Sequence, residues 1–385
     1  MFDVDPLEAG AAYALYRHGQ DVQTREIVGA LQSQAPQAPT VVDIRVHLDD
    51  DDDAEPINAL DYATADMPES WDDYIGQPAL KREIQIRMLA AQHRGEAMPH
   101  TLLASGRPGV GKTAMARLIA KTMGVQCYEM CAPFKMETLI KAAETLQDGD
   151  VLFIDEIHLL AKGGGDQILL KVLEDKVGFL PDGTVVPLND ITIVGATTDA
   201  GIMRQPILDR FMVKPDFESY SLTELAEIAV VFAYRRDAED LISDELAVAI
   251  AKACRNTPRM IDDLVLAARD LGHAIGRAPT AVELLDFKKL ESDGLTRTDV
   301  RYLTAGRQLC ARTFKEHGVE KVEYIVGEKT IMGILRETPL GLSRIERALV
   351  ESGLIQRTRG GRRLTDKGIA RAEEFIAAGK GFTEV

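Results

Sequence analysis

The chain has 385 residues, and 45% of them are hydrophobic, which is enough for two or three domains with buried cores. No stretch approaches the ~18 uninterrupted apolar residues of a membrane-spanning helix, and the N-terminal residues lack the basic start and apolar run of a secretory signal. The four cysteines form neither a disulfide framework nor a zinc-binding pattern. Membrane-spanning and disulfide-stabilised classes are therefore excluded, and we expect a cytoplasmic protein without a membrane partner.

The formal net charge of −16 is unevenly distributed along the chain. Residues 1–68 carry 3 Arg against 14 acidic residues, whereas residues 295–385 carry 17 Lys and Arg against 12 acidic residues. A basic C-terminal end is compatible with DNA binding despite the negative total.

Residues 1–68 are predicted to form an acidic extension. Five consecutive aspartates at Asp49–Asp53 make a like-charge run that cannot pack and normally stays solvated. We expect this extension to be partly disordered, with at most a small helical element between Pro6 and Gln34. The alternative is an acidic mimic that occupies a basic DNA groove or recruits a partner.

A phosphate-binding loop follows a short apolar strand at Thr101–Ala104 and precedes a predicted helix at Ala114–Met123. The pattern is G-x-x-x-x-G-K-[ST], in the strand-to-helix context that the motif requires. Its glycines let the backbone wrap phosphate oxygens, so that N–H groups and the helix N-terminus point at the anion. Lys112 would reach the β- and γ-phosphates and the Thr113 hydroxyl would ligate Mg²⁺. The predicted nucleotide-binding residues of the loop are Gly106, Gly109, Val110, Gly111, Lys112 and Thr113.

A second decisive pattern is the apolar run Val151–Ile154 followed by Asp155 and Glu156. It predicts a buried strand of a parallel sheet with two acids at its carboxyl end, where α/β proteins bind ligands. Asp155 would hold Mg²⁺ and Glu156 would polarise the water that attacks the γ-phosphate. A strand that simply ends in exposed acids is the alternative.

Further strands and helices complete a parallel α/β domain over residues 69–217. Ile191–Ala196 is another buried strand, and Val177–Leu188 is predicted to be a hairpin. Residues 218–293 show helices only, which predicts a small helical lid.

Residues 294–385 end in the outline of a winged helix. Two or three helices are expected after Gly294, then a helix at Leu342–Ser352, a short strand, a basic Gly turn and a second strand. The arginines of this wing are interpreted as phosphate contacts, with a solvated Arg-rich hairpin as the alternative. They are Arg357, Arg359, Arg362 and Arg363.

Taken together, these motifs resemble those of the AAA+ ATPases, and more narrowly the RuvB family of bacterial motors for Holliday-junction branch migration. The similarity spans about residues 69–374. The segments that carry it are DDYIGQ (72–77), GRPGVGKT (106–113), GDVLFIDEIH (149–158), VGATTDAG (194–201), ILDRF (207–211), NTPR (256–259), DGLTRTD (293–299) and SGLIQRTRGGR (352–362).

The resemblance implies a hexameric ring with ATP and Mg²⁺ bound between neighbouring subunits. Tyr74 and Ile75 would flank the adenine, and Thr197 would sense the γ-phosphate. Arg259 would contact the phosphates from the lid, and Arg210 would be an arginine finger that reaches the next subunit's site. A rigid fork donor suits developing phosphate charge, and its delivery in trans makes hydrolysis depend on assembly.

The expected function is therefore an ATP-hydrolysing DNA motor of recombination and repair, acting on branched or duplex DNA. The predicted hairpin at Val177–Leu188 is several residues shorter than the family's apolar hairpin, which docks on RuvA, and this makes a RuvA-like partner doubtful. The alternative is an ATP-switched AAA+ loader or assembly factor that binds DNA or protein without processive translocation.

Overall fold

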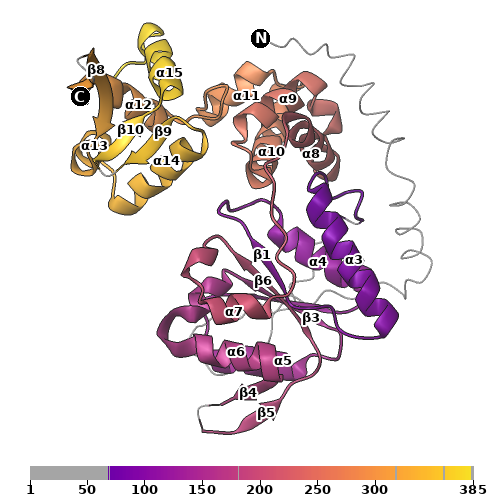
Figure 1. The fold of residues 1–385 in the computed structure, drawn as a ribbon. Coiled ribbons are helices and arrows are strands. Elements are labelled where there is room, and N and C mark those ends of the chain that lie inside the picture. Colours follow the sequence, from indigo (N-terminus) through magenta and orange to yellow (C-terminus); the bar gives the residue numbers. More distant parts are fainter. Residues whose placement is uncertain (1–67, 69, 181, 317–318, 359, 383–385) are drawn as a thin grey trace. The chain divides into compact units, whose positions relative to one another are not determined.

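The computed structural model describes residues 68, 70–180, 182–316, 319–358 and 360–382 (Figure 1). The predicted acidic extension, apart from Pro68, lies outside the described residues, as does Arg359. The chain forms two compact units. The first holds the described residues up to Arg235 together with Thr257–Arg259, and the second holds Arg236–Asn256 and the residues from Met260 onward. The predicted domain boundaries near residues 217 and 293 stay predictions.

The first unit is built on a four-stranded parallel sheet in the order β1-β6-β3-β2. Parallel strands end at one edge of a sheet, and the register places Ala104 beside Thr197 and Asp155 beside Cys131. The loops that follow β1, β3 and β6 therefore meet at this edge. The strands are β1 (Thr101–Ala104), β2 (Cys127–Cys131), β3 (Val151–Asp155) and β6 (Thr192–Thr197).

Helices cover both faces of this sheet (Figure 1). Successive residues of β3 alternate between the two cores: Phe153 packs with helices α3 and α4, whereas Leu152 and Ile154 pack with α5, α6 and α7. This period of two is the pattern of a strand that is buried on both sides. The helices are α3 (Pro78–Arg94), α4 (Lys112–Met123), α5 (Met136–Thr145), α6 (Gly165–Asp175) and α7 (Gln205–Arg210).

The remaining elements of the first unit are two short 3₁₀ helices, a hairpin and one long helix. The predicted hairpin is confirmed, because β4 and β5 pair antiparallel with Phe179 opposite Val185. These elements are η2 (Ile157–Gly164), β4 (Val177–Phe179), β5 (Val185–Pro187), η3 (Ala200–Ile202) and α8 (Leu222–Arg235).

The second unit begins with helices and ends in a winged helix. The predicted order of helix, strand, turn and strand is confirmed in α14 (Pro339–Glu351), β9 (Ile355–Thr358) and β10 (Gly361–Leu364). The core of this part joins α12, α14 and α15 to the sheet. The helices that precede or follow are η4 (Glu239–Leu241), α9 (Asp244–Ala253), α10 (Pro258–Ile275), α11 (Ala281–Lys288), α12 (Arg297–Leu309), α13 (Glu328–Leu335) and α15 (Asp366–Ala377).

The helices predicted between Gly294 and Leu342 are present as α12 and α13, but the prediction missed two strands. Two long antiparallel strands, β7 (Ala311–Glu316) and β8 (Val319–Val326), follow α12 and extend the wing into a four-stranded sheet in the order β7-β8-β10-β9. The sequence Tyr-Ile-Val at residues 324–326 has high strand propensity. Pairing of β8 with β10, far along the chain, decides between strand and helix here.

The segment DGLTRTD (293–299) follows α11 in the chain and packs against the residues at the end of α9 in the second unit. Gly294 has φ +76, and a Cβ atom there would lie 2.1 Å from the carbonyl oxygen of Ala253. Arg255 donates from Nε to the Gly294 carbonyl (2.7 Å) and forms an ion pair with the buried carboxylate of Asp299. The segment is therefore a structural joint as well as a family motif.

We predict that Gly294→Ala destabilises the second unit by more than Gly276→Ala does. Both glycines have positive φ, which costs an L-residue about 1–2 kcal/mol, but nothing lies within 4 Å of the Cβ position at Gly276. At Gly294 the backbone of α9 must also move. Thermal unfolding followed by circular dichroism compares the two variants, and equal melting temperatures would contradict this account of the joint.

Candidate functional site

The phosphate loop lies between β1 and α4, as the motif predicts. Gly109 (φ +75) and Gly111 (φ +102) both adopt the left-handed backbone that favours glycine. A Cβ at Gly111 would lie 2.6 Å from the Tyr74 hydroxyl, and one at Gly109 would lie 2.8 Å from Cβ of Arg259. Helix α4 begins at Lys112 without a side-chain cap, so its first N–H groups are open to an anion.

Lys112 is buried at the start of α4, with its ammonium 3.4 Å from the Arg107 carbonyl oxygen. Burial lowers the pKa of this ammonium, the carboxylates of Glu156 and Asp155 oppose the shift, and the charge of Arg259 adds to it. These four charged groups are thus close enough to influence one another. A phosphate placed among them would supply the negative charge that the lysine lacks.

Asp155 and Glu156 end β3 at the edge where the phosphate loop lies. The Glu156 N–H donates to Oδ1 of Asp155 at 2.9 Å, and Glu156 itself has φ +49. This backbone turns the chain out of the strand and directly into η2. Both carboxylates therefore lie at the junction of β3 and η2, and their predicted roles toward a metal ion and water stay predictions.

The threonine in contact with Glu156 is Thr198, and the sequence singled out Thr197. Thr198 donates its N–H (3.1 Å) and its hydroxyl (3.0 Å) to the Glu156 carboxylate. The Thr197 side chain is fully buried, and its hydroxyl lies 2.9 Å from Nδ1 of His158. Thr197 is the last residue of β6 and Thr198 the first beyond it, so the two side chains leave the chain in different directions. The sensor role of Thr197 stays a prediction, and Thr198 is the hydroxyl that contacts Glu156.

Tyr74 packs against the phosphate loop, and Ile75 beside it is partly exposed. The Tyr74 hydroxyl lies 3.3 Å from the Gly111 carbonyl oxygen, and burial raises its pKa well above the usual value. Lys81 donates to the Tyr74 carbonyl (2.8 Å), and Gln77 exchanges two hydrogen bonds with the backbone of Glu218. The turn is therefore held rigidly against the loop, and the adenine contacts stay predictions.

The two predicted phosphate arginines differ in their surroundings. The Arg259 N–H donates to the Gly109 carbonyl at 3.3 Å, which brings this residue to the phosphate loop. Arg210, at the end of α7, forms an ion pair with Glu174 of α6 at 2.8 Å. Among the described residues Arg210 has no contact with Lys112 or Glu156. Its finger role therefore requires a second subunit.

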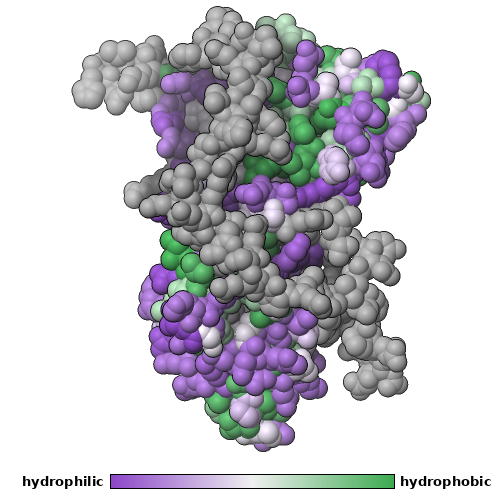
Figure 2. All heavy atoms as spheres, turned by 90° about the vertical axis from the view of Figure 1, so that its right-hand side faces the viewer, coloured by the Kyte–Doolittle hydropathy of each residue, from purple (hydrophilic) through white to green (hydrophobic). Residues whose placement is uncertain are grey.

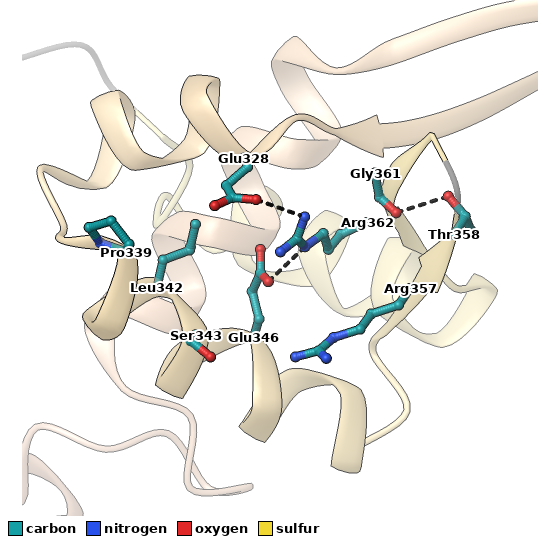
Figure 3. Close-up of a pocket in the computed structure, with 9 residues that line it drawn as sticks. All are labelled: Glu328, Pro339, Leu342, Ser343, Glu346, Arg357, Thr358, Gly361 and Arg362. Carbon is teal, nitrogen blue, oxygen red and sulfur yellow. Dashed lines mark hydrogen bonds and ion pairs between the residues drawn. The ribbon is translucent and has the colours of Figure 1, made fainter. Parts of the chain in front are cut away.

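Two of the wing arginines, Arg357 and Arg362, line a cavity of about 370 Å³ between α13, α14 and the wing strands (Figure 3). Arg362 donates to the buried carboxylate of Glu346 (2.7 Å) and pairs with Glu328 (3.3 Å). Arg363 is also occupied, by Glu323 at 2.7 Å and Gln356 at 2.9 Å. Arg357 is exposed and makes no ion pair or hydrogen bond with the described residues.

Two further arginines, missed from the sequence, lie on the exposed face of α14. Arg344 and Arg347 are three residues apart, which places them on one side of the helix. Within the described part of the chain neither has an ionic or hydrogen-bonding partner. The signal was present in the sequence, because α14 is the second helix of a helix-turn-helix arrangement and such helices contact DNA.

Two family models match this chain, namely the Holliday junction DNA helicase RuvB P-loop domain over residues 67–217 and the RuvB C-terminal winged helix domain over residues 292–372. A Holliday junction branch migration complex subunit RuvB from Synechococcus sp. (strain CC9902) is 36% identical over 314 residues, covering 78% of this chain and 86% of the relative. The chain belongs to the RuvB family. The predicted fold class is thereby confirmed.

A solved RuvB structure and a second sequence relative agree with this assignment. The Thermotoga maritima RuvB Holliday junction branch migration motor superposes with a TM-score of 0.66 at 28% identity, covering 83% of this chain and all of that one. A RuvB from Ligilactobacillus salivarius (strain UCC118) is 35% identical, covering 77% of this chain and 88% of its own length. As in an AAA+ protein of this family, the chain is an ATPase whose P-loop domain binds nucleotide.

Among the described residues, none of the helices combines the length and the apolar character that crossing a bilayer requires.

We predict that Arg362→Ala destabilises the winged helix by about 3 kcal/mol, because it leaves the Glu346 carboxylate buried without its counter-charge. Among the described residues, Glu346 then keeps only the Tyr302 hydroxyl, at 3.2 Å. Arg357→Ala is the matched control from the same wing and should leave the melting temperature unchanged. Differential scanning calorimetry of both variants makes the comparison, and a normal transition in Arg362→Ala would show that its ion pairs are dispensable.

Proposed function

We propose that this protein is an ATP-driven motor that moves Holliday junctions or other branched DNA, as the names of its relatives state for them. The observation that carries the proposal is the meeting of Lys112, Asp155, Glu156 and Thr198 at one sheet edge, in a chain that also has the family's winged helix. The loader alternative is not favoured. The relatives are named as branch-migration subunits, and the match covers 86% and 88% of their length.

The residues present fit a nucleotide with its magnesium ion. The positive-φ glycines leave a cradle that side chains would fill, and the hydroxyl of Thr113 and carboxylate of Asp155 are the hard oxygen donors that Mg²⁺ takes. Bound Mg²⁺ would neutralise developing charge on the phosphates. Lys112 and Arg259 would orient the phosphates, and Glu156, held by Thr198, would accept a proton from the attacking water.

The proposed role of Arg210 requires that the chain assembles into a ring, for which we expect six subunits. In the single chain Arg210 is paired with Glu174, and Met212, two residues further along the chain, is an exposed apolar side chain. A second copy docking on this face would gain apolar contact and receive the guanidinium at its nucleotide. An arginine delivered in this way contributes about 10³-fold or more to phosphoryl transfer.

A protein partner remains compatible with the hairpin despite its short length. Phe179 and Val185 pair across β4 and β5, and both are exposed. Figure 2 shows hydrophobic surface at its lower end, where Figure 1 places these strands. The length of the hairpin alone is thus no argument against a RuvA-like partner.

A cytoplasmic location of the protein stays a prediction.

We predict that Glu156→Gln and Arg210→Ala each lower steady-state ATP hydrolysis by at least 10²-fold, since one removes the base and the other the trans donor. A four-way DNA junction should stimulate the wild type, and chelation of Mg²⁺ should abolish hydrolysis.

Mixing the subunits separates a shared site from an independent one. Arg210→Ala subunits added to wild type should inhibit more than in proportion to their fraction. Activity that merely follows the wild-type fraction would rule out a finger in trans. If DNA does not stimulate ATP hydrolysis by the wild type and the protein does not move a junction, the alternative function as a loader or assembly factor is favoured instead.

We predict that the double variant Arg344→Ala with Arg347→Ala binds duplex DNA less tightly and with a smaller dependence on salt. Each lost phosphate contact should reduce the slope of log K against log salt by about 0.9. Lys252→Ala, an exposed cation on α9, is the control that should bind normally. An unchanged slope in the double variant would exclude α14 from the DNA interface.

A further inference from the structure

His158 contacts two groups of the nucleotide site, although none of the roles assigned above falls to it. The imidazole is buried, with 8% of the residue exposed. Its Nδ1 atom lies 3.2 Å from Oε2 of Glu156 and 2.9 Å from the hydroxyl oxygen of Thr197. One ring nitrogen thus touches the catalytic carboxylate and the end of strand β6.

The backbone fixes this position of the imidazole. Glu156 turns the chain into η2, where the Leu159 N–H donates to the Glu156 carbonyl at 2.9 Å. Ile157, the first residue of η2, packs on Gly195 of β6, and a Cβ atom at 195 would lie 2.9 Å from its Cδ1. The absence of a side chain at Gly195 therefore lets η2 approach β6 and places His158 beside Thr197.

The position of the ring nitrogen favours one tautomer of His158. Nδ1 lies at ion-pair distance from a carboxylate, which only accepts hydrogen bonds, so this neighbour stabilises the tautomer that carries the proton on Nδ1. In that tautomer the Thr197 oxygen, which also accepts from the Asp199 N–H at 3.0 Å, is the hydrogen-bond acceptor of Nδ1 at 2.9 Å. The Glu156 carboxylate then has Thr198 on one side and the Nδ1–H of His158 on the other.

We propose that His158 is a positioning residue that ties the Glu156 carboxylate to the buried hydroxyl of Thr197. The proposal rests on the proposed role of Glu156 as the base for water. While His158 contacts both groups, the Glu156 carboxylate and the Thr197 end of β6 move together. A phosphate that contacts this end of the strand therefore sets the orientation of the Glu156 base. Without it, Thr198 alone holds the carboxylate, which can turn away from the water.

The role predicts a change in turnover rather than in nucleotide affinity, because His158 contacts the base and not the phosphate loop. Two variants of the full chain test it. In His158→Asn the amide nitrogen lies as many bonds from Cα as Nδ1 and restores the donor, whereas His158→Leu places a methyl group there. We expect Leu to lower kcat about tenfold or more and Asn to stay within about threefold of wild type. The KM for ATP and the binding of a fluorescent ATP analogue should change less than about twofold in both.

Thr197→Val supplies an independent arm, since it removes the other end of the tie and leaves the imidazole in place. It should lower kcat as His158→Leu does, and the double variant should be no worse than the more impaired single one. This arm also decides the matter if His158→Leu melts below the assay temperature. Wild-type kcat in Thr197→Val or in a folded His158→Leu would overturn the proposal, as would equal losses in Leu and Asn. If Glu156→Gln hydrolyses ATP like wild type, the proposed function itself fails, and that outcome is distinct.

Discussion

Parallel pairing of β1, β6 and β3 is the constraint on which the nucleotide site depends. The register sets Ala104 beside Thr197 and Ile154 beside Gly195, so the three strands end together. The phosphate loop, the acidic pair and the paired threonines are far apart in the chain and meet only because of this register. A slip of one residue would turn each strand's side chains to the opposite face and would dismantle the site together with both cores.

One strained backbone position of this unit lies in the nucleotide site itself. Glu156 adopts φ +49 without being a glycine, which costs about 1–2 kcal/mol, and such outliers persist where surrounding structure fixes them. Here the packing of Ile157 on Gly195 and the contacts of Thr198 with Glu156 provide that support. The same turn that strains the backbone places the Glu156 carboxylate within reach of Thr198, so one unfavourable backbone conformation orients the residue that we propose as the base.

The sequence predicted those parts of the fold and the site that local patterns determine. Two such patterns are each contained in a short stretch of sequence: the glycines and Lys112 of the phosphate loop, and the apolar run that ends in Asp155. Which of two adjacent threonines contacts Glu156 depends on where β6 ends, and the position of His158 depends on the approach of η2 to that strand. The strand β8 likewise depends on pairing with β10. Each of these is set by contacts between distant segments, which a single sequence does not display.

The winged helix shows the same limit for charge. Arg357 and Arg362 look equivalent in the sequence. In the structure Arg362 forms an ion pair with the buried Glu346, whereas Arg357 is exposed to solvent. A guanidinium that neutralises a buried carboxylate cannot also release counterions from DNA without leaving that carboxylate unpaired. The unpaired positive charge of the described residues of this domain therefore includes Arg344 and Arg347 of α14 as well as Arg357 of the wing. Because a helix fixes the spacing of the two backbone positions, the proposed DNA contact of Arg344 and Arg347 would cost only the ordering of their side chains.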